Sequence, residues 1–216
     1  MTVMTLPLFP LTTILFPDGR LPLQIFELRY LTMIKQCIAQ RSAFGVVAQT
    51  VPRQPPQGGT TANTLTEPMS QETFTATGTT ATVVWHAVAQ PGLMRINCVG
   101  GQRFSIQRTQ QQKLGLWTAE VLPIAADLLI PVPDELADTV TALRQVIATL
   151  TLQATEVSQM PIAQPYKFDD CGWVANRWCE LIPMQPAQRQ RLLVLENPLI
   201  RLELVQDLLE TGGFLR

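Results

Sequence analysis

The chain has 216 residues and a formal net charge of −1, from 16 basic and 17 acidic residues. Hydrophobic residues make up 46% of it, which is enough to build a sizeable core without disulfide bonds or bound metal. A near-neutral chain has no overall field that attracts a phosphate backbone or an acidic membrane surface, so neither nucleic acid nor membrane is an expected partner.

The first half of the chain is predicted to be mainly β-structure, because runs of β-branched and aromatic residues alternate with Gly and Pro. The expected strands cover residues 4–8, 13–16, 43–51, 73–88, 93–98, 103–109 and 116–122. Many short strands joined by turns favour a closed or nearly closed barrel.

One helix is expected inside this β-region, over residues 26–40. Its apolar residues recur at spacings of three or four, which gives the single apolar stripe of an amphipathic helix. Such a helix can lie across the opening of a barrel. Residues 52–70 are instead rich in Pro, Gly, Gln and Thr and offer almost nothing to bury, so we expect a long surface loop there.

The second half is predicted to be helical. Apolar residues recur at helical spacing from Leu136 to Leu150, and a second helix fits from residue 169 or 170 to residue 182. Trp173 and Trp178 fall largely on the buried side of that second helix, where a core role is favoured over a ligand cage.

Two further helices are expected near the C-terminus. A short one follows Pro186. The last is expected to begin with Asn197 as its cap and Pro198 at its first position, and to stop at Gly212 and Gly213. The boundary between the β-rich and the helical parts is expected within residues 125–131.

The cysteines show neither a C-x-x-C pair nor the spacing of a zinc site. They are expected to be reduced, mostly buried thiols: Cys37, Cys98, Cys171 and Cys179. No run approaches the ~18 apolar residues that span a bilayer, and prolines interrupt the apolar start before a signal core can form. A cytoplasmic protein without a bound metal is therefore expected.

Polar residues that could carry catalysis do not form a recognisable constellation. His86 is the only histidine and has no Cys, Asp or Ser motif to match it. Asp169 and Asp170 are adjacent, so on a helix their side chains would point about 100° apart, which favours a helix cap over a carboxylate dyad. No catalytic residue is predicted, and the chain is not expected to be an enzyme.

Charged side chains elsewhere leave two interpretations open. Glu27 and Arg29 are close together at a helix start, where they could orient a ligand or form a helix-end charge arrangement, and the second is favoured. Arg189, Arg191 and Arg201 are the best local basic group, and we expect them to form a solvated face because no exposed aromatics are interleaved with them.

Motifs spaced along nearly the whole chain carry a family resemblance. They are Leu-Pro-Leu-Phe-Pro-Leu at 6–11, Leu-Pro-Leu-Gln-Ile-Phe-Glu-Leu-Arg-Tyr at 21–30, Phe-Gly-Val-Val at 44–47, Val-Gly-Gly-Gln-Arg-Phe at 99–104, Asp-Cys-Gly-Trp at 170–173 and Asn-Pro-Leu-Ile-Arg-Leu at 197–202. In this order they resemble the N-terminal, substrate-recognising domain of Lon proteases.

The resemblance implies an α+β fold: an N-terminal PUA-like β-barrel with one inserted helix, followed by a C-terminal helical bundle. The corresponding subdomains would be residues 1–125 and 126–216. It also implies a non-catalytic polypeptide-binding module without a cofactor, acting as an adaptor or chaperone-like protein in proteolysis. The partners would be unfolded or extended polypeptide segments and a protease acting in trans. Neither a G-x-x-x-x-G-K-[ST] phosphate loop nor a recognisable Ser-Lys protease site is present in this chain.

The candidate peptide-binding residues lie in the proline-rich region near the N-terminus: Phe16, Leu21, Pro22, Leu23 and Phe26. If this region is an exposed apolar rim it could hold a client, whereas a buried run would only be part of the fold. The opening run at 6–11 leaves the same choice between a peptide-contacting edge and packing, and packing is favoured. The alternative function is RNA binding through the PUA-like barrel, which rests on fold analogy alone.

Overall fold

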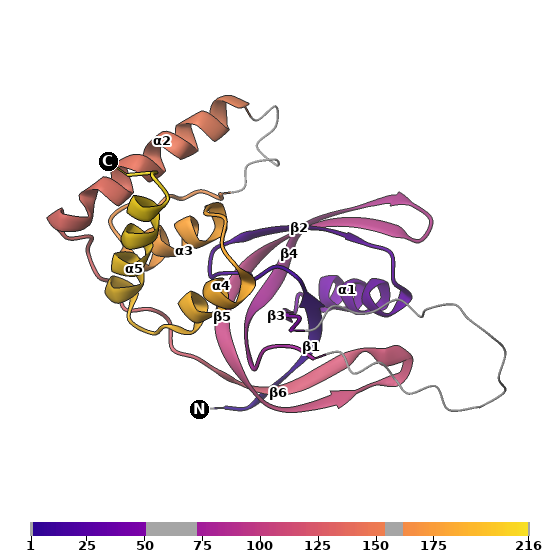
Figure 1. The fold of residues 1–216 in the computed structure, drawn as a ribbon. Coiled ribbons are helices and arrows are strands. Elements are labelled where there is room, and N and C mark those ends of the chain that lie inside the picture. The colour runs from indigo at the N-terminus through magenta and orange to yellow at the C-terminus, as the bar shows by residue number, and fades with distance from the viewer. Residues whose placement is uncertain (1, 51–72, 154–161, 216) are drawn as a thin grey trace, which may run out of the picture.

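A computed structural model gives the fold and describes residues 2–50, 73–153 and 162–215 (Figure 1). The strands are β1 (Met4–Leu11), β2 (Arg20–Ile25), β3 (Phe44–Ala48), β4 (Thr77–Gln90), β5 (Leu93–Gln111) and β6 (Trp117–Pro123). The α-helices are α1 (Leu28–Gln40), α2 (Ala137–Gln153), α3 (Cys171–Leu181), α4 (Pro186–Val194) and α5 (Pro198–Thr211), and the short 3₁₀ helices are η1 (Lys113–Gly115) and η2 (Asp134–Leu136). The predicted α+β class is confirmed. The loop expected at 52–70 lies outside the described residues.

The strands form one six-stranded sheet in the order β2-β5-β4-β3-β1-β6, and β5 also pairs with β6. Every pairing is antiparallel except that of β1 with β3. Figure 1 shows α1 beside the sheet and helices α2 to α5 gathered at its other side. The barrel and the division at residue 125 remain predictions, while the grouping of strands before helices is observed.

Strand β5 replaces two of the predicted strands, 93–98 and 103–109, with one continuous element of 19 residues. Its first half pairs with β2 and β4, and its second half pairs with β4 and β6. Gly100 lies where the partner of β5 changes from β2 to β6. A Cβ atom on Gly100 would stand 2.1 Å from the carbonyl oxygen of Phe16. Glycine is required here because the chain around Phe16 passes directly over the strand.

Residues 13–16 do not form the predicted strand, although Ile14, Leu15 and Phe16 are buried. They form a loop held by a hydrogen bond, in which the Thr79 hydroxyl donates to the Leu15 carbonyl at 2.6 Å. Thr79 is itself fully buried. The loop's apolar residues therefore serve the core without pairing with a neighbouring strand.

Strand β1 contains the opening Leu-Pro-Leu-Phe-Pro-Leu run and lies inside the sheet, not at an edge. Its first part pairs only with β6, so Pro7 faces Thr118, while its last part pairs only with β3, so Pro10 lies beside Val47. Each proline thus has one neighbouring strand, which explains how β1 tolerates a missing N–H at both positions. Leu8 is fully buried, as the packing interpretation predicted.

Strand β2 was not among the predicted strands and occupies one end of the sheet order. Pro22 stands in its middle, opposite Asn97 of β5. A proline at this place fits an end strand, because the N–H that it lacks would point away from the ladder.

Three apolar clusters fill the molecule. One packs α1 against the sheet, through residues such as Ile34, Ile96 and Phe44, and a smaller one packs β1 against the second half of β5 and β6. The third unites α2 to α5 with Phe16 and Ile14 from the first half of the chain. This third cluster joins the helices to the sheet.

Local signals placed the helices correctly. The Asp170 carboxylate caps α3 by accepting from Gly172 N–H at 3.0 Å, and Asn197 caps α5. Trp173 and Trp178 are both 3% exposed, and the Trp178 indole donates to the Thr139 carbonyl at 3.0 Å, so their predicted core role is confirmed. The four cysteines are free and buried, as expected.

Candidate functional site

The five predicted peptide-binding residues have very different exposures. Phe16 and Leu21 are core residues, 0% and 7% exposed. Leu23 is half-buried, Pro22 is exposed, and Phe26 is 70% exposed. Because side chains alternate along a strand, Pro22 also lies on the opposite face of β2 from Leu21 and Leu23. Leu23 and Phe26 are therefore the two that share an accessible surface.

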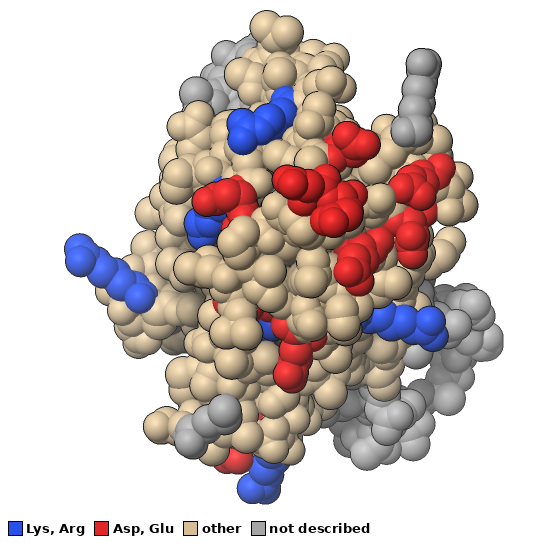
Figure 2. All heavy atoms as spheres, turned by 90° about the vertical axis from the view of Figure 1, so that its left-hand side faces the viewer, with Lys and Arg blue, Asp and Glu red and all other residues tan. Residues whose placement is uncertain are grey.

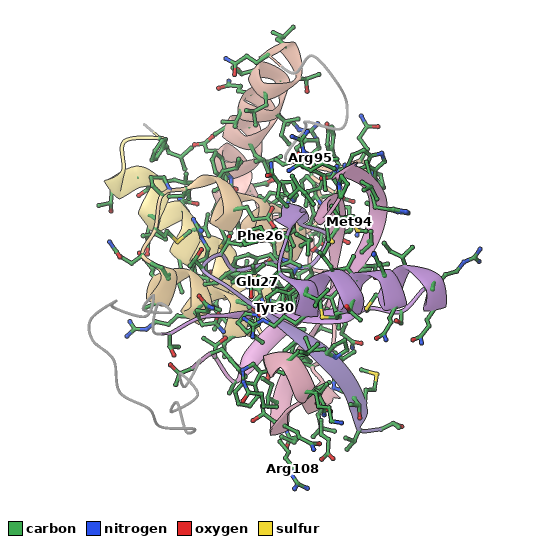
Figure 3. The ribbon with its side chains drawn as sticks, turned by 90° about the vertical axis from the view of Figure 1, so that its right-hand side faces the viewer. Phe26, Glu27, Tyr30, Met94, Arg95 and Arg108 are labelled. Atoms are coloured by element: carbon green, nitrogen blue, oxygen red, sulfur yellow. The ribbon has the colours of Figure 1, made fainter. Side chains whose placement is uncertain are left out.

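This surface is a hollow of about 250 Å³, here called the α1 hollow, between the ends of β1 and β2 and the start of α1. It is lined by Phe9, Pro10, Leu11, Thr12, Leu23, Gln24, Ile25, Phe26, Glu27, Arg29, Tyr30 and Gln49. Figure 3 shows Phe26, Glu27 and Tyr30 together at this place. The hollow combines an apolar lining with a few polar side chains, the usual make-up of a ligand-binding surface.

Aromatic stacking makes a rigid wall of the α1 hollow. The rings of Phe9 and Tyr30 lie 4.0 Å apart and nearly parallel, at 18°. Both side chains are more than nine-tenths buried, so the edges that line the hollow are fixed in place. On the outside, Phe26 and Leu28 are 70% and 67% exposed. Phe26 lines the hollow, and Leu28 follows two residues later as the first residue of α1.

Glu27 and Arg29 form an ion pair, with Arg29 Nε 3.0 Å from a Glu27 carboxylate oxygen. Arg29 also donates through Nη1 to the Gly115 carbonyl at 2.7 Å, and its guanidinium lies 4.5 Å from the centre of the Tyr30 ring. These contacts fasten the start of α1 to the connection between β5 and β6. They support the structural interpretation of the pair and hold the hollow's polar side in position.

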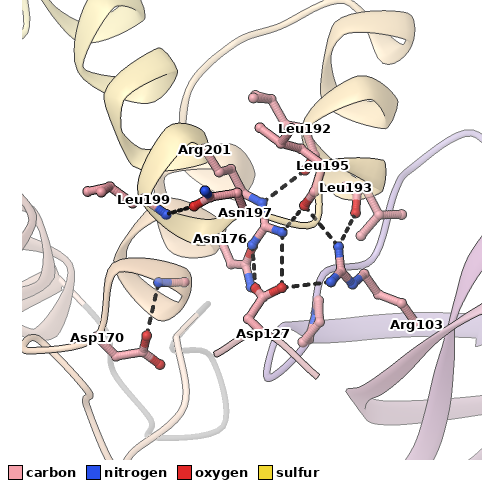
Figure 4. A network of polar contacts seen from close by, with 12 residues as sticks. Arg103, Asp127, Asp170, Asn176, Leu192, Leu193, Leu195, Asn197, Leu199 and Arg201 are labelled. Carbon is pink, nitrogen blue, oxygen red and sulfur yellow. Dashed lines mark hydrogen bonds and ion pairs between the residues drawn. The ribbon is translucent and has the colours of Figure 1, made fainter. Parts of the chain in front are cut away.

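Buried charges also join the two halves of the chain, in a network around Asp127 (Figure 4). Arg103 Nη2 lies 2.7 Å and Arg201 Nη1 2.5 Å from the two Asp127 carboxylate oxygens. Arg201 also donates to the Asn176 side-chain oxygen at 3.1 Å and to the carbonyls of Leu192 and Leu195. The predicted solvated face is therefore wrong for Arg201, which is 1% exposed because these acceptors replace water.

Sequence reasoning missed Asp127 entirely. It is the single charged residue in the apolar stretch 124–130, and such a lone carboxylate can be buried only with a partner. That pattern was the available signal. The position of Asp127 also explains the glycine at position 172. A Cβ atom on Gly172 would stand 3.0 Å from an Asp127 carboxylate oxygen, so a larger residue would crowd the network.

A second carboxylate, that of Glu180 of α3, lies against the loop that precedes β2, and its side chain is 19% exposed. Arg177 Nη2 is 3.2 Å from Glu180 Oε1 and donates to the Pro17 carbonyl at 2.7 Å. A Cβ atom on Gly19 would stand 2.0 Å from the same carboxylate oxygen. Glu180 and Arg177 thus form a polar contact between α3 and the loop.

Glu180→Gln is expected to remove a pH-dependent loss of stability. Burial raises the pKa of Glu180 from 4.5 to about 7, and the negative charge of Asp18 adds to this rise. The positive charges of Arg177 and Arg189 and a hydrogen bond from the Phe16 N–H act in the opposite direction and only partly offset it. The folded state then keeps its proton to higher pH than the unfolded chain, so this contribution to stability is full below about pH 4.5 and is lost as the pH rises to about 7. Urea unfolding of both proteins across this range is the measurement. Parallel stability profiles would contradict the assignment.

No catalytic or metal-binding residue was predicted from the sequence. His86 is exposed on β4, and residues 2–50, 73–153 and 162–215 contain no group of three His, Cys, Asp or Glu side chains able to hold a metal ion. On the helical face drawn in Figure 2, acidic side chains gather while Lys and Arg lie apart from one another. No helix in the described ranges has the length and apolar character needed to cross a bilayer.

Comparisons with known proteins agree with this architecture. The family model of the ATP-dependent protease La (LON) substrate-binding domain matches residues 5–211. A Lon N-terminal domain protein from Xanthomonas campestris is similar in structure, with 26% identity over 94% of this chain and 98% of that chain and a TM-score of 0.69. The N-terminal domain of a Mycobacterium avium complex Lon protease shares the fold at 15% identity, over 94% of this chain and 97% of that chain, with a TM-score of 0.58. Curated proteins gave no match.

Proposed function

Since this chain belongs to the family of Lon substrate-binding domains, we propose that it binds unfolded or extended polypeptide at the α1 hollow and catalyses no reaction itself. The observation that carries the site is the exposed pair Phe26 and Leu28 beside the hollow. Apolar side chains of a client would replace water on these surfaces, and a folded protein would keep its own apolar side chains inside.

The finer architecture belongs to the same proposal. The pairing of β5 with β6 joins both ends of the strand order β5-β4-β3-β1-β6, which supports a PUA-like barrel. The single apolar cluster shared by α2 to α5 supports a helical bundle as the second subdomain. We place the boundary between them at residues 125 and 126, next to Asp127.

A role in proteolysis follows from the same likeness. The Mycobacterium avium complex neighbour is the N-terminal domain of a Lon protease. The proposal is that this chain presents clients to a protease acting in trans, as an adaptor in the cytoplasm. Co-incubation of a labelled client with such a protease, with and without this chain, would test the adaptor role through the cleavage rate.

The double variant Phe26→Ser/Leu28→Ser is expected to weaken the binding of an unfolded polypeptide by at least about tenfold. Each side chain buries apolar surface worth roughly 1.5–3 kcal/mol when fully covered, and a tenfold change requires about 1.4 kcal/mol. Fluorescence anisotropy with a labelled, reduced and carboxymethylated polypeptide measures the affinity.

The matched control is Leu129→Ser, which removes an 84% exposed leucine from the connection between sheet and helices. This control should bind like the wild-type protein. Absence of wild-type binding at high micromolar concentration would overturn the proposed function. Equal losses in the double variant and in the control would overturn the assignment to the α1 hollow.

RNA binding remains the alternative prediction, and no specific contact in the described residues favours it. The test is a gel shift with structured RNA at increasing salt. A phosphate-driven complex would lose affinity steeply with salt concentration. Salt-sensitive binding of RNA together with no binding of unfolded polypeptide would replace the present proposal.

A further inference from the structure

A second cavity lies where the loop before β2 meets helices α3 and α4. It has a volume of about 160 Å³ and is here called the seam cavity. Its polar lining comes from Arg20 at the start of β2, Glu180 of α3 and Arg189 of α4, and its apolar lining includes Ile14, Leu21 and Ile162. Arg20 and Arg189 are half-buried, so the cavity reaches the surface.

The two arginines that line this cavity hold N–H groups with no acceptor among the described residues. The buried Nε atoms of Arg20 and Arg189 make no hydrogen bond to any described residue, and the same holds for Nε and Nη1 of the fully buried Arg177, which contacts the lining residue Glu180. Arg189 uses only Nη2, which donates to the Ile182 carbonyl at 3.1 Å. Arg20 makes no side-chain hydrogen bond or ion pair with any described residue. Because a buried donor without an acceptor is unfavourable, these groups favour a ligand that supplies acceptors.

The charge balance of the cavity is positive. Glu180 is its one acidic lining residue among the described side chains, and Arg177 already engages this carboxylate at 3.2 Å. The Asp18 carboxylate, whose charge acts on Glu180, pairs with Lys167 at 2.7 Å. The charge of Arg189 also acts on Glu180, but neither Arg20 nor Arg189 forms an ion pair with a described residue. The cavity lining therefore carries more positive than negative charge, which favours an anion.

We propose that the seam cavity binds a carboxylate, and that the C-terminal carboxylate of a client polypeptide supplies it. The guanidinium group is planar and offers two parallel N–H donors, which match the two oxygens of a carboxylate. The apolar wall from Ile14, Leu21 and Ile162 would then contact the last side chain of the client. This inference rests on the proposed function, and it adds a second, polar contact for the free end of the chain.

The test compares two fluorescent peptides that differ in one group. Both end in leucine, one with a free carboxylate and the other with a carboxamide, and their affinities are measured by anisotropy with the full chain. We expect the free-acid peptide to bind at least about tenfold more tightly, which corresponds to about 1.4 kcal/mol. Arg20→Gln should reduce its affinity to that of the amide and leave the amide unchanged. Equal affinities of the two peptides would overturn the proposal.

Controls separate folding, ligand source and the two sites. Arg20 has no partner to lose, so Arg20→Gln should unfold at the wild-type midpoint. Arg95→Gln, which removes another arginine of the sheet that is exposed, should not change the preference for the free acid. If N-acetyl-leucine bound as tightly as the peptide, the source would be a small free carboxylate, and the assignment to polypeptide ends would fail.

The two proposals can fail independently. If the free acid has no advantage while unfolded polypeptide still needs Phe26 and Leu28, the seam cavity is not a carboxylate site and the proposed function stands. If the free acid is preferred through Arg20 while unfolded polypeptide shows no dependence on Phe26 and Leu28, the α1 hollow is not the client site.

Discussion

Replacing Asp127 with alanine is expected to lower the free energy of unfolding by about 3–5 kcal/mol, the range for removing one partner of a buried ion pair. Arg103 and Arg201 are 3% and 1% exposed, so neither guanidinium can recover its lost acceptor from water without a change in packing. Burial already lowers the pKa of Arg103, and the charge of Asp127 is the main opposing effect. The Asp127→Ala variant would leave the buried positive charges of both Arg103 and Arg201 without their carboxylate partner.

Urea unfolding followed by tryptophan fluorescence measures this loss. The control is Asp207→Ala, which removes an exposed aspartate from α5 and should change stability by less than about 0.5 kcal/mol. A decrease below about 1 kcal/mol in the Asp127 variant would show that the network contributes little. The effect should persist at high salt, since buried pairs are screened much less than surface pairs.

Phe16→Ala is expected to cost about 3–5 kcal/mol of stability, as is usual when a buried phenylalanine is truncated. Phe16 is 0% exposed and packs in the cluster that joins the helices to the sheet. Phe26→Ala should instead change stability by about 0.5 kcal/mol or less, because that side chain is 70% exposed.

Binding measurements complete the comparison of these two phenylalanines. Under conditions where both variants are folded, Phe26→Ala should weaken the binding of unfolded polypeptide and Phe16→Ala should not. A wild-type midpoint for Phe16→Ala in thermal unfolding would contradict its place in the core. The opposite pattern of binding would exchange the roles assigned to the two residues.

The helices and their ends were predicted well from the sequence because their signals are local. The cap at Asn197 and the proline that follows it placed the start of α5, and Asp170 placed the start of α3. Strand bounds were predicted less well, since they depend on pairing with distant segments. Gly100 and Gly101 look like a turn in the sequence, whereas in the structure β5 continues through both, and Gly100 lets the strand pass beneath the loop that contains Phe16.

The family was evident from separated motifs, but the site was predicted only in part. Phe16 and Phe26 lie in the same proline-rich region, but Phe16 is buried in the cluster shared with the helices and Phe26 is exposed. This difference depends on segments distant in the sequence, which no short pattern encodes. Arg201 was assigned to a solvated surface because its partner, Asp127, is 74 residues away in sequence. The seam cavity was missed for the same reason, since Arg20 and Arg189 come from opposite ends of the chain.

Pro22 also has a consequence for the behaviour of the molecule in solution. A protein that holds extended segments risks having its own sheet lengthened by them, and an end strand with a full set of free N–H groups invites this addition. The proline in the middle of β2 takes one donor out of that row and interrupts the register in which a further strand would align. Pro22 is therefore expected to disfavour the pairing of a further strand, including that of a second copy of this chain, along the open side of β2.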